Sequence, residues 1–242
     1  LPATGTYTVT LNSDVAGSAA VRLLRITDKQ AVITPDGAEV NAVIDQPGVV
    51  GRYTFTGKSG QYVYVDFPAS TLDSQCGFLR LFGPDKHELT SGCIINHVGY
   101  IDTVRLPADG QYAVVVDPNS ITIGQARLRL VFPTAQAASI SMDGPAVTVA
   151  LKKLGSFATL TFNGAKGQRI FVDLPTSELP SQCGLLTLRA PDASNIASGC
   201  VINHKGDLSS DGVVLPATGR YTITLDPGAG DTGTTTIRLR SR

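Results

Sequence analysis

Apolar and polar residues alternate along several short stretches of the chain. Between Gly60 and Phe67, the odd-numbered positions from Val63 onward are apolar, whereas the even-numbered positions beginning at Tyr62 are mixed. Residues 169–174 repeat this pattern with apolar residues at the even positions. Because successive side chains of a strand point to opposite faces, each stretch predicts a strand with one face toward a core.

Turn-forming residues divide the chain into pieces of strand length. The sequence has 25 Gly and 14 Pro, and Thr, Val, Leu and Ile fill the stretches between them. Runs of β-branched residues bounded by Gly and Pro are typical of short strands. No helical stripe of ten or more residues is evident. We therefore predict an all-β fold of antiparallel β-sandwich or jelly-roll-like modules, which show turn signals about every 8–12 residues.

An internal repeat sets the domain organisation. The segment Gly51–Asp85 matches Ser156–Asp192, and Asp66 aligns with Asp173 at an offset of 107 (173 − 66). The closing sequence LPADGQYAVVV, from Leu106, matches LPATGRYTITL, from Leu215, and also LPATGTYTVTL at the start of the chain. The chain therefore contains two complete copies of one module and part of a third.

These matches divide the chain into three parts. Residues 1–26 are predicted to be the closing strands of a preceding, truncated repeat. Residues 27–133 and 134–242 are predicted to be the first and second complete β-sandwich modules. The last copy has its own closing strands, so it offers no vacancy to residues 1–26 of another chain. We expect the chain to be an excerpt of a longer array or to lack upstream residues.

The four cysteines occupy matching positions in the two copies. If Cys76 faces Cys93 across an antiparallel hairpin, the midpoint falls between Pro84 and Asp85, a pair with good turn chemistry. The second copy has Pro191-Asp192 at its corresponding midpoint. A Cys/Cys/His metal site is the alternative, but each module would supply only three ligands with unsuitable spacing. We predict the disulfides Cys76–Cys93 and Cys183–Cys200, and hence an oxidising, extracellular setting.

Three segments of each copy resemble a known family. They are YTFTGKSGQYVYVDF, LRLFGPD and LPADGQYAVVVDP in the first copy, and TLTFNGAKGQRIFVDL, LTLRAPD and LPATGRYTITLDP in the second. In this order they resemble the bacterial pre-peptidase C-terminal (PPC) domain and related extracellular jelly-roll modules. The resemblance covers about 80 residues of each copy. It implies non-catalytic appendages of secreted proteins, acting as spacers or as binders of polymeric substrates. The cysteine hairpin and the Asn-His pair described below depart from the family pattern.

Charge and hydropathy restrict the partners. Lys plus Arg equals Asp plus Glu at 20 each, so the net charge is zero. A nucleic-acid-binding protein would show a basic excess or patch, so we predict no nucleic-acid partner. No apolar run approaches the length of a membrane span, and no signal peptide opens the sequence. We predict a secreted, extracellular or cell-surface location.

An Asn-His pair follows the second cysteine in both copies. Asn96-His97 lies in CIINH and Asn203-His204 in CVINH. One interpretation is a ligand-binding or metal-binding site repeated once per module, which Asp66/Asp173 or Asp102/Asp207 would join. The other is structural: Asn shapes the exit of the strand, and His caps a neighbouring loop through backbone hydrogen bonds.

The LPATG sequences at residues 1–5 and 215–219 match the sortase pattern, but each is followed by a predicted strand rather than by an apolar span. Pro starts a turn there and Gly ends it. The tyrosine two residues beyond each Gly (Tyr7, Tyr112 and Tyr221) is predicted to be structural, with its ring buried and its hydroxyl bonded to the backbone.

Catalytic and cofactor motifs are missing from the sequence. It contains no Gly-x-Ser-x-Gly elbow, His-Glu-x-x-His or phosphate-binding loop. The three histidines are His87, at a predicted hairpin tip, and the two of the repeated pair. The acidic segment most similar to a calcium loop is Asp226–Asp231, and the other copies lack it. We predict that the protein is not an enzyme and has no cofactor, and calcium bound at Asp226–Asp231 is the alternative.

These observations favour a non-catalytic extracellular repeat module. It would act as a structural spacer, or as an adhesive or presentation array, within a larger secreted bacterial protein. Its partners would then be the neighbouring domains of a longer chain. The alternative is a polysaccharide-binding or cell-surface-protein-binding module with a site near the loop after the second cysteine. Trp is absent and aromatic residues are only 6%, which does not support a repeated aromatic platform for glycans.

Overall fold

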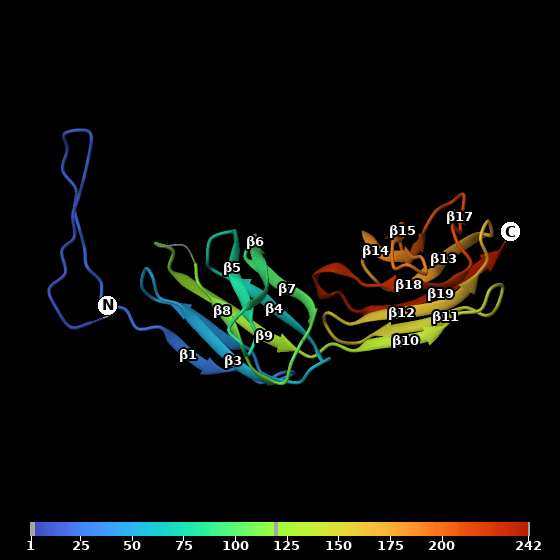
Figure 1. The fold of residues 1–242 in the computed structure, drawn as a ribbon, viewed down its shortest axis with the longest axis horizontal. Helices are drawn as coiled ribbons and strands as arrows, with labels where there is room; N and C mark the ends of the chain where they lie inside the picture. The colour runs from blue at the N-terminus through green and yellow to red at the C-terminus, as the bar shows by residue number, and fades with distance from the viewer. Residues whose placement is uncertain (1–2, 119–120, 242) are drawn as a thin grey trace.

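A computed structural model describes residues 3–118 and 121–241 of the chain. It contains two β-sandwich modules, which lie one after the other along the long axis (Figure 1). Within the described residues the only helical element is a short 3-10 turn, η1 (Gly228–Gly230). The structure confirms the predicted all-β fold of tandem sandwich modules.

The first module is a nine-stranded sheet folded on itself, with the order β1-β3-β8-β5-β6-β7-β4-β9-β2. The parallel pair β1 and β3 is followed by antiparallel pairs throughout. The strands are β1 (Lys29–Val32), β2 (Val40–Ile44), β3 (Gly51–Gly57), β4 (Tyr62–Ser70), β5 (Gln75–Phe82), β6 (Glu88–Ile95), β7 (Val98–Arg105), β8 (Gly110–Val116) and β9 (Gly124–Val131).

The second module repeats this topology with the order β10-β12-β18-β14-β15-β16-β13-β19-β11, and β17 pairs with β13. The two modules are therefore copies in fold as well as in sequence. The strands are β10 (Ala135–Ser139), β11 (Val147–Leu151), β12 (Phe157–Gly164), β13 (Arg169–Ser177), β14 (Gln182–Arg189), β15 (Asn195–Ile202), β16 (Lys205–Asp207), β17 (Val213–Val214), β18 (Gly219–Leu225) and β19 (Gly233–Ser241).

Each module has its own core. In β4, Val63, Val65 and Phe67 belong to the first core cluster, and the apolar positions of residues 169–174 belong to the second. The predicted inward faces of these strands are therefore confirmed. Tyr64, on the opposite face of β4, is also fully buried but lies outside the core cluster.

The structure contains both disulfides, one in the hairpin of each module. Lys86 N–H donates to the Gly83 carbonyl at 3.0 Å, which closes the predicted Pro-Asp turn of the first hairpin. The pairing is less regular than a straight hairpin, because two extra residues bulge from β5 between Cys76 and Leu79. Gly77, with φ +82°, gives β5 the backbone freedom that this bulge requires.

The repeated tyrosines anchor the entry to β8 and β18. Tyr112 and Tyr221 are fully buried, and each hydroxyl donates to a backbone carbonyl four residues earlier, that of Ala108 or Ala217, at 2.6 Å. The prediction of a structural role is confirmed for these two residues. Their hydroxyls are satisfied by the same local loop in both modules, so the LPATG and LPADG sequences act as folded corners.

The N-terminal part differs from the two modules. Residues 3–28 contain no strand and form a long loop that projects beyond the first module and returns to β1 (Figure 1). The prediction that residues 1–26 are closing strands falls partly on residues 1 and 2, which lie outside the described residues. In the rest of that range, no strand of the described chain pairs with the predicted strands, so the ladder hydrogen bonds that define a strand are not made.

Candidate functional site

The repeated Asn-His pair forms a two-residue hairpin turn. Asn96 and His97 join β6 to β7 with φ of 50° and 69°, and Asn203 and His204 join β15 to β16 with nearly the same angles. The flanking residues Ile95 and Val98 are paired in register. Two consecutive residues with positive φ are what a type I′ hairpin requires, and Asn adopts this conformation at low cost.

Backbone contacts hold the two turns in place. The N–H of Asn96 donates to Ser74 Oγ, and that of Asn203 to Ser181 Oγ, both at 3.0 Å. In the second module, His204 Nδ1 also lies 2.9 Å from the Ser177 carbonyl. These contacts provide a structural reason for the recurrence of Asn-His in both modules. A ligand-binding role for Asn96, His97, Asn203 and His204 stays a prediction. The pattern Ile-Ile-Asn-His-Val held the signal for the hairpin, which sequence reasoning missed.

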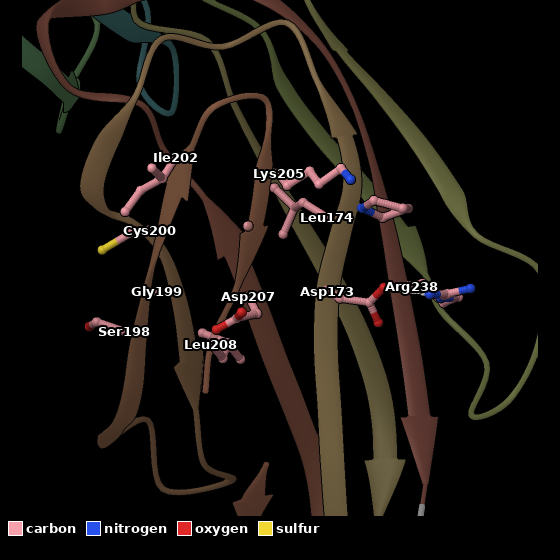
Figure 2. Close-up of a pocket in the computed structure, with 12 residues that line it drawn as sticks. Asp173, Leu174, Ser198, Gly199, Cys200, Ile202, Lys205, Asp207, Leu208 and Arg238 are labelled. Carbon is pink, nitrogen blue, oxygen red and sulfur yellow. Dashed lines mark hydrogen bonds and ion pairs between the residues drawn. The ribbon is translucent and has the colours of Figure 1, made fainter. Parts of the chain in front are cut away.

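A groove lies beside this hairpin in both modules, at matching positions. In the second module it has a volume of about 700 Å³ and runs over β13, β15 and β16 (Figure 2). In the first module a groove of about 590 Å³ covers the equivalent strands β4, β6 and β7. Each groove includes the second cysteine of its module and the residues that flank the Asn-His turn.

The chemistry of the two grooves differs. In the first module, Tyr64 and Tyr100 stack with ring centroids 6.0 Å apart, and Ile95 and Val98 are half exposed at the rim. This groove is therefore largely apolar. In the second module the lining includes Lys205 and Asp207 from β16, and Asp173 and Arg238 from β13 and β19 (Figure 2).

Two of the aspartates that were expected to join a ligand site are paired with arginines. Asp66 forms an ion pair with Arg129, and Asp173 forms one with Arg238 at 2.7 Å. Arg240 Nε adds a second contact to Asp173 at 3.1 Å. The hydrogen-bonded carboxylate of Asp173 also raises the pKa of Arg238. Both carboxylates are therefore compensated by cations on the neighbouring strand.

The tentative match of Asp102 with Asp207 is wrong. Strand register pairs Cys200 with Asp207, and it pairs Cys93 with Tyr100. Asp207 is therefore equivalent to Tyr100. The two copies diverge in the loop that follows, and this divergence misled the sequence alignment.

The two modules meet in a packed joint. Tyr62 of β4 contacts Phe157 of β12 edge to face, with centroids 4.9 Å apart. Thr103 Oγ1 donates to the Gly155 carbonyl at 2.8 Å. Lys153 Nζ lies 2.8 Å from Asp36 Oδ2 and also donates to the Phe132 carbonyl at 3.3 Å. Apolar, neutral polar and ionic contacts thus all cross from one module to the other.

Tyr64 is at the centre of this joint. A Cβ built on Gly155 would lie 2.6 Å from Tyr64 Cβ, and one built on Gly230 would lie 2.7 Å from the Tyr64 hydroxyl oxygen. Only glycine allows both loops of the second module to approach so closely. The Tyr64 hydroxyl is buried and makes no hydrogen bond with the described residues. Burial, with the negative charge of Asp66 and Asp102, raises the pKa of Tyr64.

Asp226 of the second module is affected by the charge of Asp102 in the first. Loss of solvent around its carboxylate, together with the charge of Asp102 in the first module, raises the pKa of Asp226 to about 6. Part of Asp226 stays exposed to solvent. The equivalent residue of the first module, Asp117, instead forms an ion pair with Arg80. Asp226 has Thr187 of β14 in place of that arginine.

The remaining candidate residues lie apart. His87 is exposed at the tip of the β5–β6 hairpin. The segment Asp226–Asp231 forms the η1 turn, and Gln182 bonds to Asp231 within it. Among the described residues, no three His, Cys, Asp or Glu side chains gather closely enough to hold a metal ion. Those residues also include no helix of the length and apolarity that a membrane crossing needs.

Comparison with known proteins adds little. No family model and no curated protein sequence matches the chain, so the resemblance to the PPC domain is not confirmed. Among solved structures, the CUB1-EGF-CUB2 domain of human MASP-1/3 matches 85% of this chain and 99% of that one. The identity is 6% and the TM-score is 0.26. A likeness this low supports no inference about function.

Proposed function

We propose that this chain is a non-catalytic, extracellular structural array, whose modules set a fixed distance and orientation between the parts of a larger secreted protein. The observation that carries this proposal is the packed joint between the modules. Neighbouring domains that share few contacts move independently. Here a fully buried tyrosine, a hydrogen bond and an ion pair link them.

The disulfides and the repeat support the same proposal. One disulfide in each hairpin suits an oxidising extracellular environment. A module that is repeated with the same topology extends a structure by a constant step. Bacterial origin and the PPC-like resemblance belong to this proposal and are supported by the sequence motifs alone.

A pair of glycine substitutions tests the joint. Gly155 and Gly48 are equivalent turn residues, with φ of +69° and +83°, so alanine strains both backbones similarly. Only at Gly155 would the new Cβ meet the other module, 2.4 Å from Thr103 Oγ1. At Gly48 it would meet only the end of the Ile26 side chain, at 3.4 Å.

Spin labels at the exposed residues His87 and Lys166, introduced as unnatural amino acids, report the distance between modules. We expect one narrow distance distribution for the wild-type chain and for Gly48→Ala, and a broad one for Gly155→Ala. A broad distribution for the wild-type chain would refute the proposal. Equal widths for the two variants would show that the Gly155 contact does not fix the joint.

A second candidate function is binding of a polysaccharide or cell-surface protein in the grooves beside the Asn-His turns. The observation that favours it is the presence of a groove at equivalent positions in both modules. Exposed Tyr100, Ile95 and Val98 offer an apolar contact surface in the first groove.

A glycan array and a cell-surface binding assay test this candidate. Tyr100→Ala and His97→Ala should weaken binding at least tenfold if the first groove is the site. Asn96→Gly preserves the positive φ and serves as the control for the turn. Binding that is unchanged in both alanine variants would exclude this groove.

A further inference from the structure

The first part of the N-terminal segment exposes residues that are core residues elsewhere in the chain. Tyr7, Val9 and Leu11 are 47%, 70% and 64% exposed. Their equivalents in β8 (Tyr112, Val114 and Val116) and in β18 (Tyr221, Ile223 and Leu225) are all 0% exposed. The alternation that buries one face of a strand in each module is therefore present in residues 6–11, where no described part of the chain covers it.

The second part of the segment shows the same contrast. Val21 and Leu23 are 59% and 90% exposed. In the first module the equivalent residues of β9, Ala126 and Leu128, are 1% and 0% exposed. In the second module their equivalents in β19 are Thr235 and Ile237, at 1% and 0%. Beyond Leu23 the copies diverge, and we term residues 3–23 the closing segment.

The closing segment already has the local corner of a module. The Tyr7 hydroxyl donates to the Ala3 carbonyl, as Tyr112 donates to Ala108 and Tyr221 to Ala217. The N–H of Ala3 also donates to the Tyr7 hydroxyl, at 3.2 Å, as at the other two corners. The corner is therefore preformed, and what the segment lacks is neighbouring strands.

We propose that the closing segment is a docking element that completes the β-sandwich of an opening half-module, a polypeptide equivalent to β1–β7 of this repeat. In the complete modules, β8 pairs with β3 and β5, and β9 pairs with β4 and β2. The closing segment thus inserts at two places in the strand order, between β3 and β5 and between β4 and β2. Its partner carries apolar faces on the strands equivalent to β3, β4 and β5.

An opening half-module cannot form one continuous sheet without strands equivalent to β8 and β9. Without β8 and β9, the strand order of a module falls into three pieces: β1-β3, β5-β6-β7-β4, and β2. Because the closing segment joins all three, its binding and the folding of the half-module are coupled. The first module of this chain is not the partner, since its own β8 and β9 fill both positions.

The experiment places residues 27–105 of this chain directly before Leu1. The join between Arg105 and Leu1 reproduces the native step from Arg105 to Leu106, because both closing sequences begin Leu-Pro-Ala. Amide hydrogen exchange is followed by mass spectrometry. We expect exchange over residues 6–11 and 19–23 to slow at least 100-fold relative to the original chain. Leu11→Asp together with Leu23→Asp should abolish this protection.

A matched control places residues 27–131 before Leu1, so that the added module closes with its own strands. There the closing segment should exchange as fast as in the original chain. Three outcomes overturn the proposal. The first is an unprotected closing segment in the fusion with residues 27–105 while the control folds. The second is equal protection in the control. The third is faster exchange in β8 and β9 of the first module, which would mean that the segment displaces them.

Discussion

The two modules share one frame but differ on the outer face of the sheet that contains β4 or β13. Both have the same strand order, the same hairpin disulfide and the same pair of buried corner tyrosines. On the outer face, Tyr64 of the first module is covered by loops of the second. Its equivalent Phe171 is half-buried, with Arg240 over its ring at 5.8 Å.

This difference distinguishes the residues that each module needs in order to fold from the residues that only serve contact with the other module. Glycines, turn residues and inward apolar positions recur because each module needs them to close. Tyr64, Thr103 and Lys153 have a role only because another module lies against them. The outer-face residues therefore diverged between copies while the frame did not.

The largest effect should come from removing the tyrosine at the joint. Tyr64→Ala deletes a fully buried ring, and we expect it to cost about 3–4 kcal/mol of unfolding free energy. Phe171→Ala, at the equivalent but half-buried position, should cost about 1 kcal/mol. Denaturant unfolding monitored by circular dichroism measures both. Equal losses would contradict the difference between the two faces.

The disulfides should contribute equally to the two modules. Each links residues separated by 17 positions, so reducing either one should cost about 3 kcal/mol in its own module. The double variants Cys76→Ser/Cys93→Ser and Cys183→Ser/Cys200→Ser are compared by urea denaturation with the exchange of each module followed separately. A loss confined to one pair would show that the two frames are not equivalent in stability.

The Asn-His turns should depend on backbone conformation. Asn96→Ala and Asn203→Ala place alanine at φ near 50°, and we expect each to cost about 1 kcal/mol. The matched variants Asn96→Gly and Asn203→Gly should leave thermal stability nearly unchanged. If glycine destabilises as much as alanine, the Asn side chain itself has a role that the turn does not explain.

The smallest effect should be a pH dependence specific to Asp226. Its folded-state pKa is raised to about 6, so the folded state favours the protonated acid and loses stability as pH rises from about 4 to about 6. Because the residue is partly exposed, screening by solvent keeps the loss below about 1 kcal/mol. Denaturant unfolding at pH 4.5 and 7 measures it. Asp226→Asn should flatten this slope, whereas Asp117→Asn, at the equivalent position beside Arg80, should not.

The features common to both modules were predictable from the sequence because they are repeated. Two copies with the same cysteine spacing, Pro-Asp turns and alternating strands indicated the sandwich, the disulfides and the buried tyrosines. The bulge at Gly77 was not predictable, since an isolated glycine does not reveal how many residues leave the ladder. Periodicity placed Tyr64 correctly on the outer face but did not reveal its burial, because loops of the second module cover it.

The joint and the grooves were beyond sequence reasoning for a different reason. Gly155 and Gly48 have the same turn geometry, and only the position of the other module makes Gly155 a point of close contact. The Asn-His pair was correctly singled out as repeated. Its two consecutive positive φ values were not deduced, because His stands where the usual Asn-Gly signature of this turn has Gly.

If the packed joint holds as we propose, the two modules form one rigid body. Residual dipolar couplings, measured on the weakly aligned chain, test it most directly, because each module reports its own alignment tensor. We expect a single tensor to fit the couplings of residues 29–118, 121–131 and 135–241. Two tensors that differ in magnitude or orientation would show independent motion of the modules and would contradict the account.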